Sequence, residues 1–201
     1  MRGISHLLVP AVLLAGLACQ SQPAAPMVYG PWEEGLTLAY EDPSQPQPQR
    51  SENRLQVRVA SSAMAPGPPN LVQLDFTSLR GHTSVLAKHH DGGIDLIDGS
   101  GRVLAQALPP RFPDLTRWVD HDTEYSVIGR ATWEGASILP TTSDPVGVWV
   151  EARSPQGLRR RSLYLPGLGE VESREERDGT WVAVNRLIAR RFTDLPATKR
   201  P

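Results

Sequence analysis

The sequence predicts a mainly β protein with a single antiparallel sheet, curved or shaped as a half-open barrel or sandwich. Three observations favour this class. Apolar and polar residues alternate repeatedly, which is the period of a strand with one buried face. Breaks rich in Gly, Pro, Asp and Ser separate these runs at short intervals. No segment shows convincing helical periodicity, and about 150 residues are enough for one buried core.

Alternation marks the strands in order along the chain. A first strand is expected at residues 36–40, in WEEGLTLAY. Later runs in which apolar or small residues largely alternate with others are also expected to be strands: 54–60 (RLQVRVA), 71–77 (LVQLDFT), 124–133 (EYSVIGRATW), 146–153 (VGVWVEAR) and 181–192 (WVAVNRLIARRF). Trp and Val favour a strand over an amphipathic helix in the last run. A short helix is considered only at residues 113–118.

Two hairpins have explicit turn chemistry. Residues 94–108 place DGSG between two apolar runs, and glycine adopts the positive φ that tight hairpin turns require. In LYLPGLGEV, Pro166 and Gly167 suit a turn between residues 163–165 and Val171. The second stretch, with Tyr164 and Gly169, resembles a Tyr-x-Pro-Gly-x-Gly-x-Val hairpin of uncharacterised secreted β-rich bacterial proteins and lipoproteins. That resemblance implies a curved antiparallel sheet and an envelope location.

The N-terminus has the layout of an export signal. Arg2 precedes a mostly apolar run, residues 4–18, which holds no acidic residue. The run is shorter than the roughly 20 apolar residues of a membrane-spanning helix, and Pro10 interrupts it. Small residues then lead to Cys19, the only cysteine in the chain.

The tract Ala-Gly-Leu-Ala-Cys at residues 15–19 resembles the lipobox of bacterial lipoproteins. This resemblance implies that residues 1–18 are a signal peptide and that Cys19 becomes acylated, with chains such as palmitate. Residues 19–31 would then form a lipid-anchored tether. By resemblance to Gram-negative sorting, Gln20 implies the outer membrane, with the domain facing the periplasm. The alternative is an ordinary cleaved signal in which Cys19 is incidental.

Residues 32–196 are expected to form one β-rich domain, followed by a disordered tail at 197–201. Within it, the Pro/Gln-rich residues 41–53 are expected to be a surface loop, since alternate prolines prevent a ladder of backbone hydrogen bonds. Alternatively, the tether extends to Asn53.

Charge is distributed unevenly along the chain. Residues 19–152 carry a net charge of −7, whereas residues 153–201 hold 11 Lys or Arg and 6 Asp or Glu, a net charge of +5. One interpretation is that late strands pair with early ones and their charges balance across strands. The other is a basic face turned toward anionic lipid or glycan. Nothing in the overall balance suggests nucleic acid as a partner.

The sequence predicts neither catalytic nor metal-binding residues and implies no cofactor. His89 and His90 are adjacent, so on a strand they point to opposite faces and do not share one ion. The chain has no G-x-S-x-G elbow, phosphate loop or dinucleotide fingerprint. A hydrolase would need His90 or His121 to converge with a carboxylate and a serine in a cleft.

Aromatic residues are the predicted ligand-binding positions: Trp133, Trp149, Tyr164 and Trp181. We expect a membrane-anchored envelope lipoprotein with a non-enzymatic binding or scaffolding role, whose partner is an envelope protein or a lipid. A scaffold predicts a filled core with an exposed edge or patch. The first alternative is a periplasmic carrier of lipid or acyl chains, which predicts a continuous apolar cavity in the curved sheet. An envelope hydrolase is the second alternative.

Overall fold

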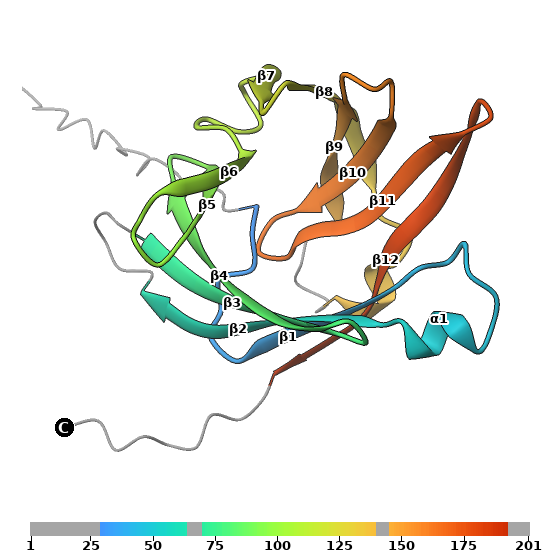
Figure 1. Ribbon diagram of the computed structural model, residues 1–201, viewed down its shortest axis with the longest axis horizontal. Helices are drawn as coiled ribbons and strands as arrows, with labels where there is room; N and C mark the ends of the chain where they lie inside the picture. Colours follow the sequence, from blue (N-terminus) through green and yellow to red (C-terminus); the bar gives the residue numbers. More distant parts are fainter. Residues whose placement is uncertain (1–28, 64–69, 140–144, 193–201) are drawn as a thin grey trace, which may run out of the picture.

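The computed structural model describes residues 29–63, 70–139 and 145–192, which form one antiparallel sheet with little helix (Figure 1). Its twelve strands are β1 (Leu36–Glu41), β2 (Leu55–Ala63), β3 (Asn70–Ser78), β4 (Gly81–His90), β5 (Gly93–Ile97), β6 (Val103–Leu108), β7 (Arg117–Asp120), β8 (Thr123–Thr132), β9 (Val146–Arg153), β10 (Arg159–Leu165), β11 (Gly169–Arg177) and β12 (Thr180–Phe192). The described helical elements are α1 (Gln49–Glu52) and the 3-10 turn η1 (Ala136–Ile138). The predicted fold class is confirmed.

Two runs of consecutive strands, β1–β6 and β7–β12, form the two halves of the sheet. They join where β1 pairs with β12, so the first and last strands lie at its centre. The two edges are therefore β6 and β7, which follow each other in the chain (Figure 1). There the backbone N–H of Gln106 donates to Asp120 Oδ2 at 3.3 Å. The sheet is thus nearly closed into a barrel.

Shifts of register bend the longer strands. They occur between Ala39 and Tyr40 in β1, between Leu163 and Tyr164 in β10, and along β8, β11 and β2. An extra residue in one strand increases the local twist and bends it, which curves the sheet. Each shift also interrupts the two-residue alternation, so side chains beyond it change face.

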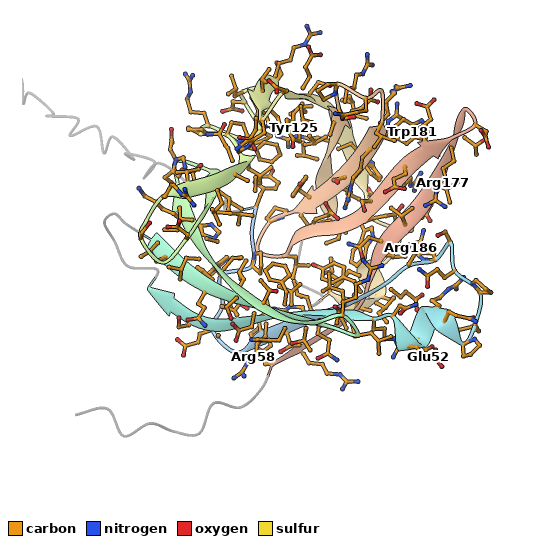
Figure 2. The ribbon with its side chains drawn as sticks, in the orientation of Figure 1. Glu52, Arg58, Tyr125, Arg177, Trp181 and Arg186 are labelled. Carbon is orange, nitrogen blue, oxygen red and sulfur yellow. The ribbon has the colours of Figure 1, made fainter. Side chains whose placement is uncertain are left out.

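Apolar side chains line the inner side of both halves. Leu38 of β1 pairs with Val57 of β2 on this side, and Val148 and Val150 of β9 belong to the same buried cluster. Figure 2 shows side chains from both halves pointing into the space between them. The hydrophobic core is therefore shared by the two halves.

Aromatic rings pack at the end of the core near the two sheet edges. The Phe112 ring contacts Tyr29 and Trp118, with centroids 4.9 and 6.3 Å apart. Trp118 stacks on Tyr125 at 5.0 Å and an interplanar angle of 5°. These rings lie between the loop that follows β6 and the first strands of the second half.

The residues just before β1 pack into the domain. Tyr29 is 2 % exposed. The backbone at Gly30 passes so close to the sheet that a Cβ there would lie 2.7 Å from His89 Cε1 and 2.6 Å from Ile94 Cδ1. Residues 29–31, expected at the end of the tether, therefore belong to the packed structure. Cys19, the signal peptide, the rest of the tether and the predicted tail lie outside the described residues, and those assignments stay predictions.

The two predicted hairpins are present as β5–β6 and β10–β11, and residues 181–192 lie in a strand as expected. The predicted loop at residues 41–53 contains α1 near its end. Residues 113–118 form no helix: turns lead into β7, whose backbone pairs with β8. In the described ranges, no helix has the length and apolar character needed to cross a membrane.

Candidate functional site

Strands β9–β12 carry charged side chains on the face opposite the core. Val148 and Val150 of β9 are buried in the core, so alternation turns the residues between and after them, including Glu151, to the other side. Cross-strand pairs extend this face over the neighbouring strands. We call the whole set the charged face: Trp149, Glu151, Arg153, Arg159, Arg161, Glu172, Arg174, Glu176, Trp181 and Arg186.

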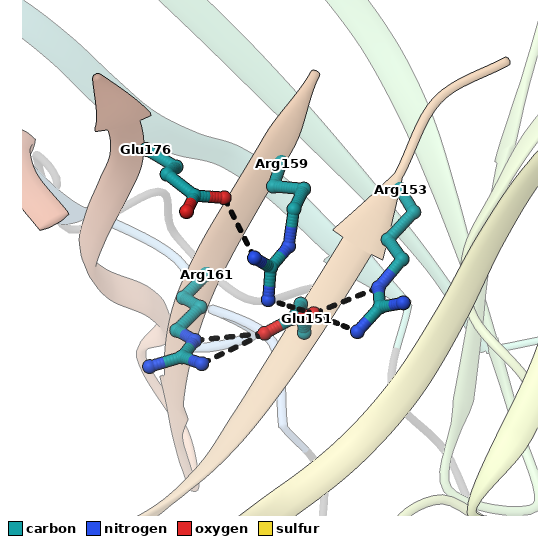
Figure 3. Close-up of polar contacts among 5 residues, drawn as sticks. All are labelled: Glu151, Arg153, Arg159, Arg161 and Glu176. Carbon is teal, nitrogen blue, oxygen red and sulfur yellow. Dashed lines mark hydrogen bonds and ion pairs between the residues drawn. The ribbon is translucent and has the colours of Figure 1, made fainter. Parts of the chain in front are cut away.

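Glu151 lies within the charged face and binds three arginines (Figure 3). Arg153 and Arg159 each donate to Oε1 at 2.9 Å. Arg161 donates to Oε2 through both Nε and Nη2, each at 2.9 Å. Arg159 also reaches Glu176 at 2.7 Å. The Glu151 side chain is 3 % exposed because guanidinium groups cover it, not because it enters the core.

These contacts keep Glu151 ionised. Burial by itself raises the pKa of the carboxyl group. Hydrogen bonds from Arg159, Arg161 and Arg153 outweigh this effect and lower the pKa to about 2. A carboxylate with this pKa is a poor general base near neutral pH, and guanidinium groups do not lose their proton in proteins. The cluster is therefore suited to binding and positioning charge, not to proton transfer.

Glu172 repeats the arrangement two strands away. Arg174 Nε donates to Oε1 at 2.7 Å, and Arg186 Nε donates to Oε2 at 3.2 Å. The Glu172 side chain is 5 % exposed, whereas Arg174 and Arg186 are 39 % and 41 % exposed. The carboxylates thus lie beneath and the guanidinium groups lie above. With five arginines and three glutamates, the charged face as defined has a positive excess.

Two of the predicted ligand-binding residues, Trp149 and Trp181, lie on the charged face. The Arg161 and Arg159 guanidinium groups lie 4.0 and 5.3 Å from the centroid of the Trp181 ring. Arg174 lies 5.1 Å from the Trp149 ring. Cation–π contacts of this kind hold guanidinium groups in place on an indole surface.

The other two predicted ligand-binding residues lie elsewhere. Trp133 follows β8 and is 2 % exposed. Tyr164 of β10 has its ring centroid 6.1 Å from that of Phe112, and burial, followed by the charge of Glu170, raises its pKa. The four aromatic residues therefore do not line one cleft.

The histidines do not assemble a metal centre in the part of the chain that the structure describes, where no three His, Cys, Asp or Glu side chains gather as ligands. His90 Nε2 lies 2.9 Å from Asp95 Oδ2, and His121 Nδ1 lies 3.1 Å from Asp120 Oδ1. His89 is buried, and burial lowers its pKa to about 4, which keeps it neutral near physiological pH.

A serine, a histidine and an aspartate do meet on β3 and β4, with a different connectivity from that of a hydrolase. Ser84 Oγ donates to Asp75 Oδ1 at 2.6 Å and lies 3.4 Å from His82 Nε2. In a catalytic triad the carboxylate orients the histidine, which activates the serine. Here the carboxylate binds the serine directly, so this exposed group is not an activated nucleophile.

The sequence does not show the charged face as one unit. Residues 153–201 carry a basic excess, but the arginines described there mostly pair within β9–β12, not with early strands. One ion pair does join late and early residues: Arg190 Nη2 lies 3.2 Å from Glu33 Oε2. The sequence signal for this face is the alternation of Glu and Arg, which places both on one side of a strand. It occurs in ESREER (172–177) and as Glu-x-Arg at 151–153.

No protein-family model matches the chain, and no curated protein matches its sequence. Two solved structures are similar to it. One is described as an exported protein with a YmcC-like fold from Bacteroides fragilis NCTC 9343, with 15% identity and a TM-score of 0.45, covering 82% of this chain and 99% of that one. The other is described as a lipoprotein from Parabacteroides distasonis ATCC 8503, with 12% identity and a TM-score of 0.48, covering 83% and 100%.

Proposed function

We propose that the chain is a lipid-anchored envelope protein whose charged face binds anionic groups without chemical conversion. The layering of charge on this face carries the proposal: Glu151 and Glu172 lie beneath guanidinium groups that stay accessible. A guanidinium group presents a planar fork of donors that matches phosphate and carboxylate oxygens. The side-chain nitrogens of these arginines outnumber the carboxylate oxygens beneath them, so donors remain for a ligand.

In this proposal the acylated Cys19 anchors the chain in the outer membrane, and the domain faces the periplasm. Several acyl chains on one residue give stable anchoring, whereas a single chain is marginal. A tether confines the charged face near the membrane surface and raises its effective concentration there. The partner is then a lipid or an envelope protein that presents anionic groups.

The carrier alternative would place the ligand on the inner side of the sheet. Tyr29, Phe112 and Trp118 pack there together with Leu108, so side chains of the chain itself occupy this region. This packing supports the outer, charged face as the binding surface.

Vesicle binding tests the proposal. The mature chain from residue 19, with Cys19→Ser to prevent acylation, should sediment with vesicles that contain phosphatidylglycerol and not with vesicles of phosphatidylcholine alone. The bound fraction should fall as salt is added, because salt screens exposed charges. Absence of binding to anionic vesicles would contradict the proposal for lipid partners.

Paired variants test whether the charged face is responsible for vesicle binding. Arg161→Gln with Arg174→Gln removes two charges while Glu151 keeps Arg153 and Arg159, so folding should persist. Binding should weaken on the order of tenfold. Arg54→Gln with Arg58→Gln removes the same charge near β2 and should have little effect. Equal losses in both pairs would indicate nonspecific attraction to net charge.

A further inference from the structure

A hollow of about 500 Å³ lies beside the charged face, at the β7–β9 end of the sheet. It is continuous with that face through strand register, because Ser126 of β8 pairs with Glu151 and Glu124 pairs with Arg153. Arg117 of β7 in turn pairs with Ser126. The side chains of Arg117, Glu124, Ser126 and Arg153 all line the hollow.

Arg153 belongs to both the charged face and the hollow. Its Nε and Nη2 hold Glu151 at 2.9 Å, and its remaining nitrogen points away from that carboxylate (Figure 3). The side chain is 61 % exposed, so this nitrogen is accessible. Glu151 thus fixes the guanidinium group and leaves one edge of it available for a ligand.

Arg117 supplies a second guanidinium group at the sheet edge. Its side chain is exposed and, among the described residues, has no ion-pair partner. Two guanidinium groups and the Ser126 hydroxyl form a donor set of the kind that binds phosphate oxygens. Glu124 is the one carboxylate among the lining residues, so the lining keeps a positive excess.

The hollow also has an apolar side. Val119 lines it and is 64 % exposed on the edge strand. An inorganic anion would leave this side unused. A ligand with a carbon substituent next to its charged group would contact both parts.

We propose that the hollow binds a phosphate ester, with Arg117 and Arg153 holding the phosphate oxygens and Val119 contacting the carbon substituent. This inference rests on the proposed function, since it assigns a chemical class and a binding position to the anionic ligand. The ester is either a phospholipid headgroup or a soluble phosphate ester, because both present the same group.

One pair of variants with two probes tests the inference. The probes are phosphatidylglycerol-containing vesicles, measured by sedimentation, and sn-glycerol 1-phosphate, measured by calorimetric titration. Arg117→Gln should weaken binding about tenfold, the expected loss for one charge-assisted contact. Arg130→Gln is the matched control, because it removes an exposed arginine of β8 that does not line the hollow. It should change binding less than about twofold, as expected for a charge without a contact.

Each outcome decides between the sources or overturns the inference. Arg117-dependent binding of vesicles alone supports a lipid headgroup, and Arg117-dependent binding of glycerol phosphate without vesicle binding supports a soluble ester. If Arg117→Gln binds like the unsubstituted chain while Arg161→Gln with Arg174→Gln loses binding, the hollow is not the binding site. The proposed function of the charged face then stands. If neither probe binds the unsubstituted chain, both are wrong. Circular dichroism of each variant verifies folding.

Discussion

The outer faces of the two sheet halves are built differently. On β3 and β4 of the first half, Asp75 accepts hydrogen bonds from its uncharged neighbours Ser84 and Gln73. In the second half, Glu151 and Glu172 each bind arginines from more than one strand and are covered by them. The inner sides are apolar in both halves. The second outer face is therefore an organised charged layer, whereas the first is an ordinary hydrated surface.

The two arrangements also differ in what they require energetically. Removing a carboxylate from water is unfavourable unless several hydrogen bonds and opposite charges compensate for the lost hydration. A solvated carboxylate such as that of Asp75 needs no such compensation. Breaking the charged layer should therefore have larger effects than equivalent changes in the first half.

The largest effect is expected for Glu151→Gln. This change leaves three guanidinium groups around a neutral amide and should lower the free energy of unfolding by about 2 kcal/mol, between the values typical of exposed and buried ion pairs. Urea denaturation measures it. Glu176→Gln is the control, since Glu176 contacts Arg159 alone among the described residues and is partly exposed. It should lose less than about 1 kcal/mol, and equal losses would remove the distinction between buried and exposed carboxylates.

The stability lost in Glu151→Gln should also depend on pH. The pKa of Glu151 is about 2 in the folded protein, below its ordinary value of 4.5, so the folded state binds fewer protons than the unfolded state. The stability that this carboxylate contributes is complete above pH 4.5 and is lost as the pH falls toward 2. Denaturation at several pH values should show the stability gap between the unsubstituted chain and Glu151→Gln narrowing across this range. A constant gap would mean that the carboxylate is not held by these arginines.

A smaller effect is expected for Trp181→Leu. The substitution keeps an apolar side chain but removes the ring beneath Arg159 and Arg161. The free energy of unfolding should therefore fall by about 1 kcal/mol. Trp32→Leu is the control, because Trp32 is exposed and has no arginine over its ring among the described residues. Similar losses from both would show that the indole of Trp181 acts only through its buried area.

The smallest effect is expected in the first half, for Asp75→Asn. Hydrogen bonds from Ser84 and then Gln73 lower the pKa of Asp75, and an amide oxygen can still accept them. The free energy of unfolding, measured by urea denaturation, should change by less than about 0.5 kcal/mol. A loss as large as that of Glu151→Gln would contradict the contrast between the two outer faces.

The fold could be predicted from the sequence more completely than the site. Alternation located Leu36 and Leu38 on one buried side of a strand, and turn chemistry located the hairpin at Pro166 and Gly167, because both signals come from residues close together in the chain. The same reasoning grouped Trp149 with Trp133 as candidate ligand contacts. It could not separate them, because their surroundings come from different strands and from the loop after β8.

The short antiparallel strands and the basic excess after residue 152 can be read from the sequence alone, since composition and the two-residue period are local properties. Tertiary structure decided which strands became neighbours and which arginines cover Glu151 and Glu172. Pairing of β1 with β12 joins segments about 150 residues apart in the sequence, and each bulge moves the following side chains to the opposite face. Contacts across strands depend on that register, so the charged face exists only in the folded sheet.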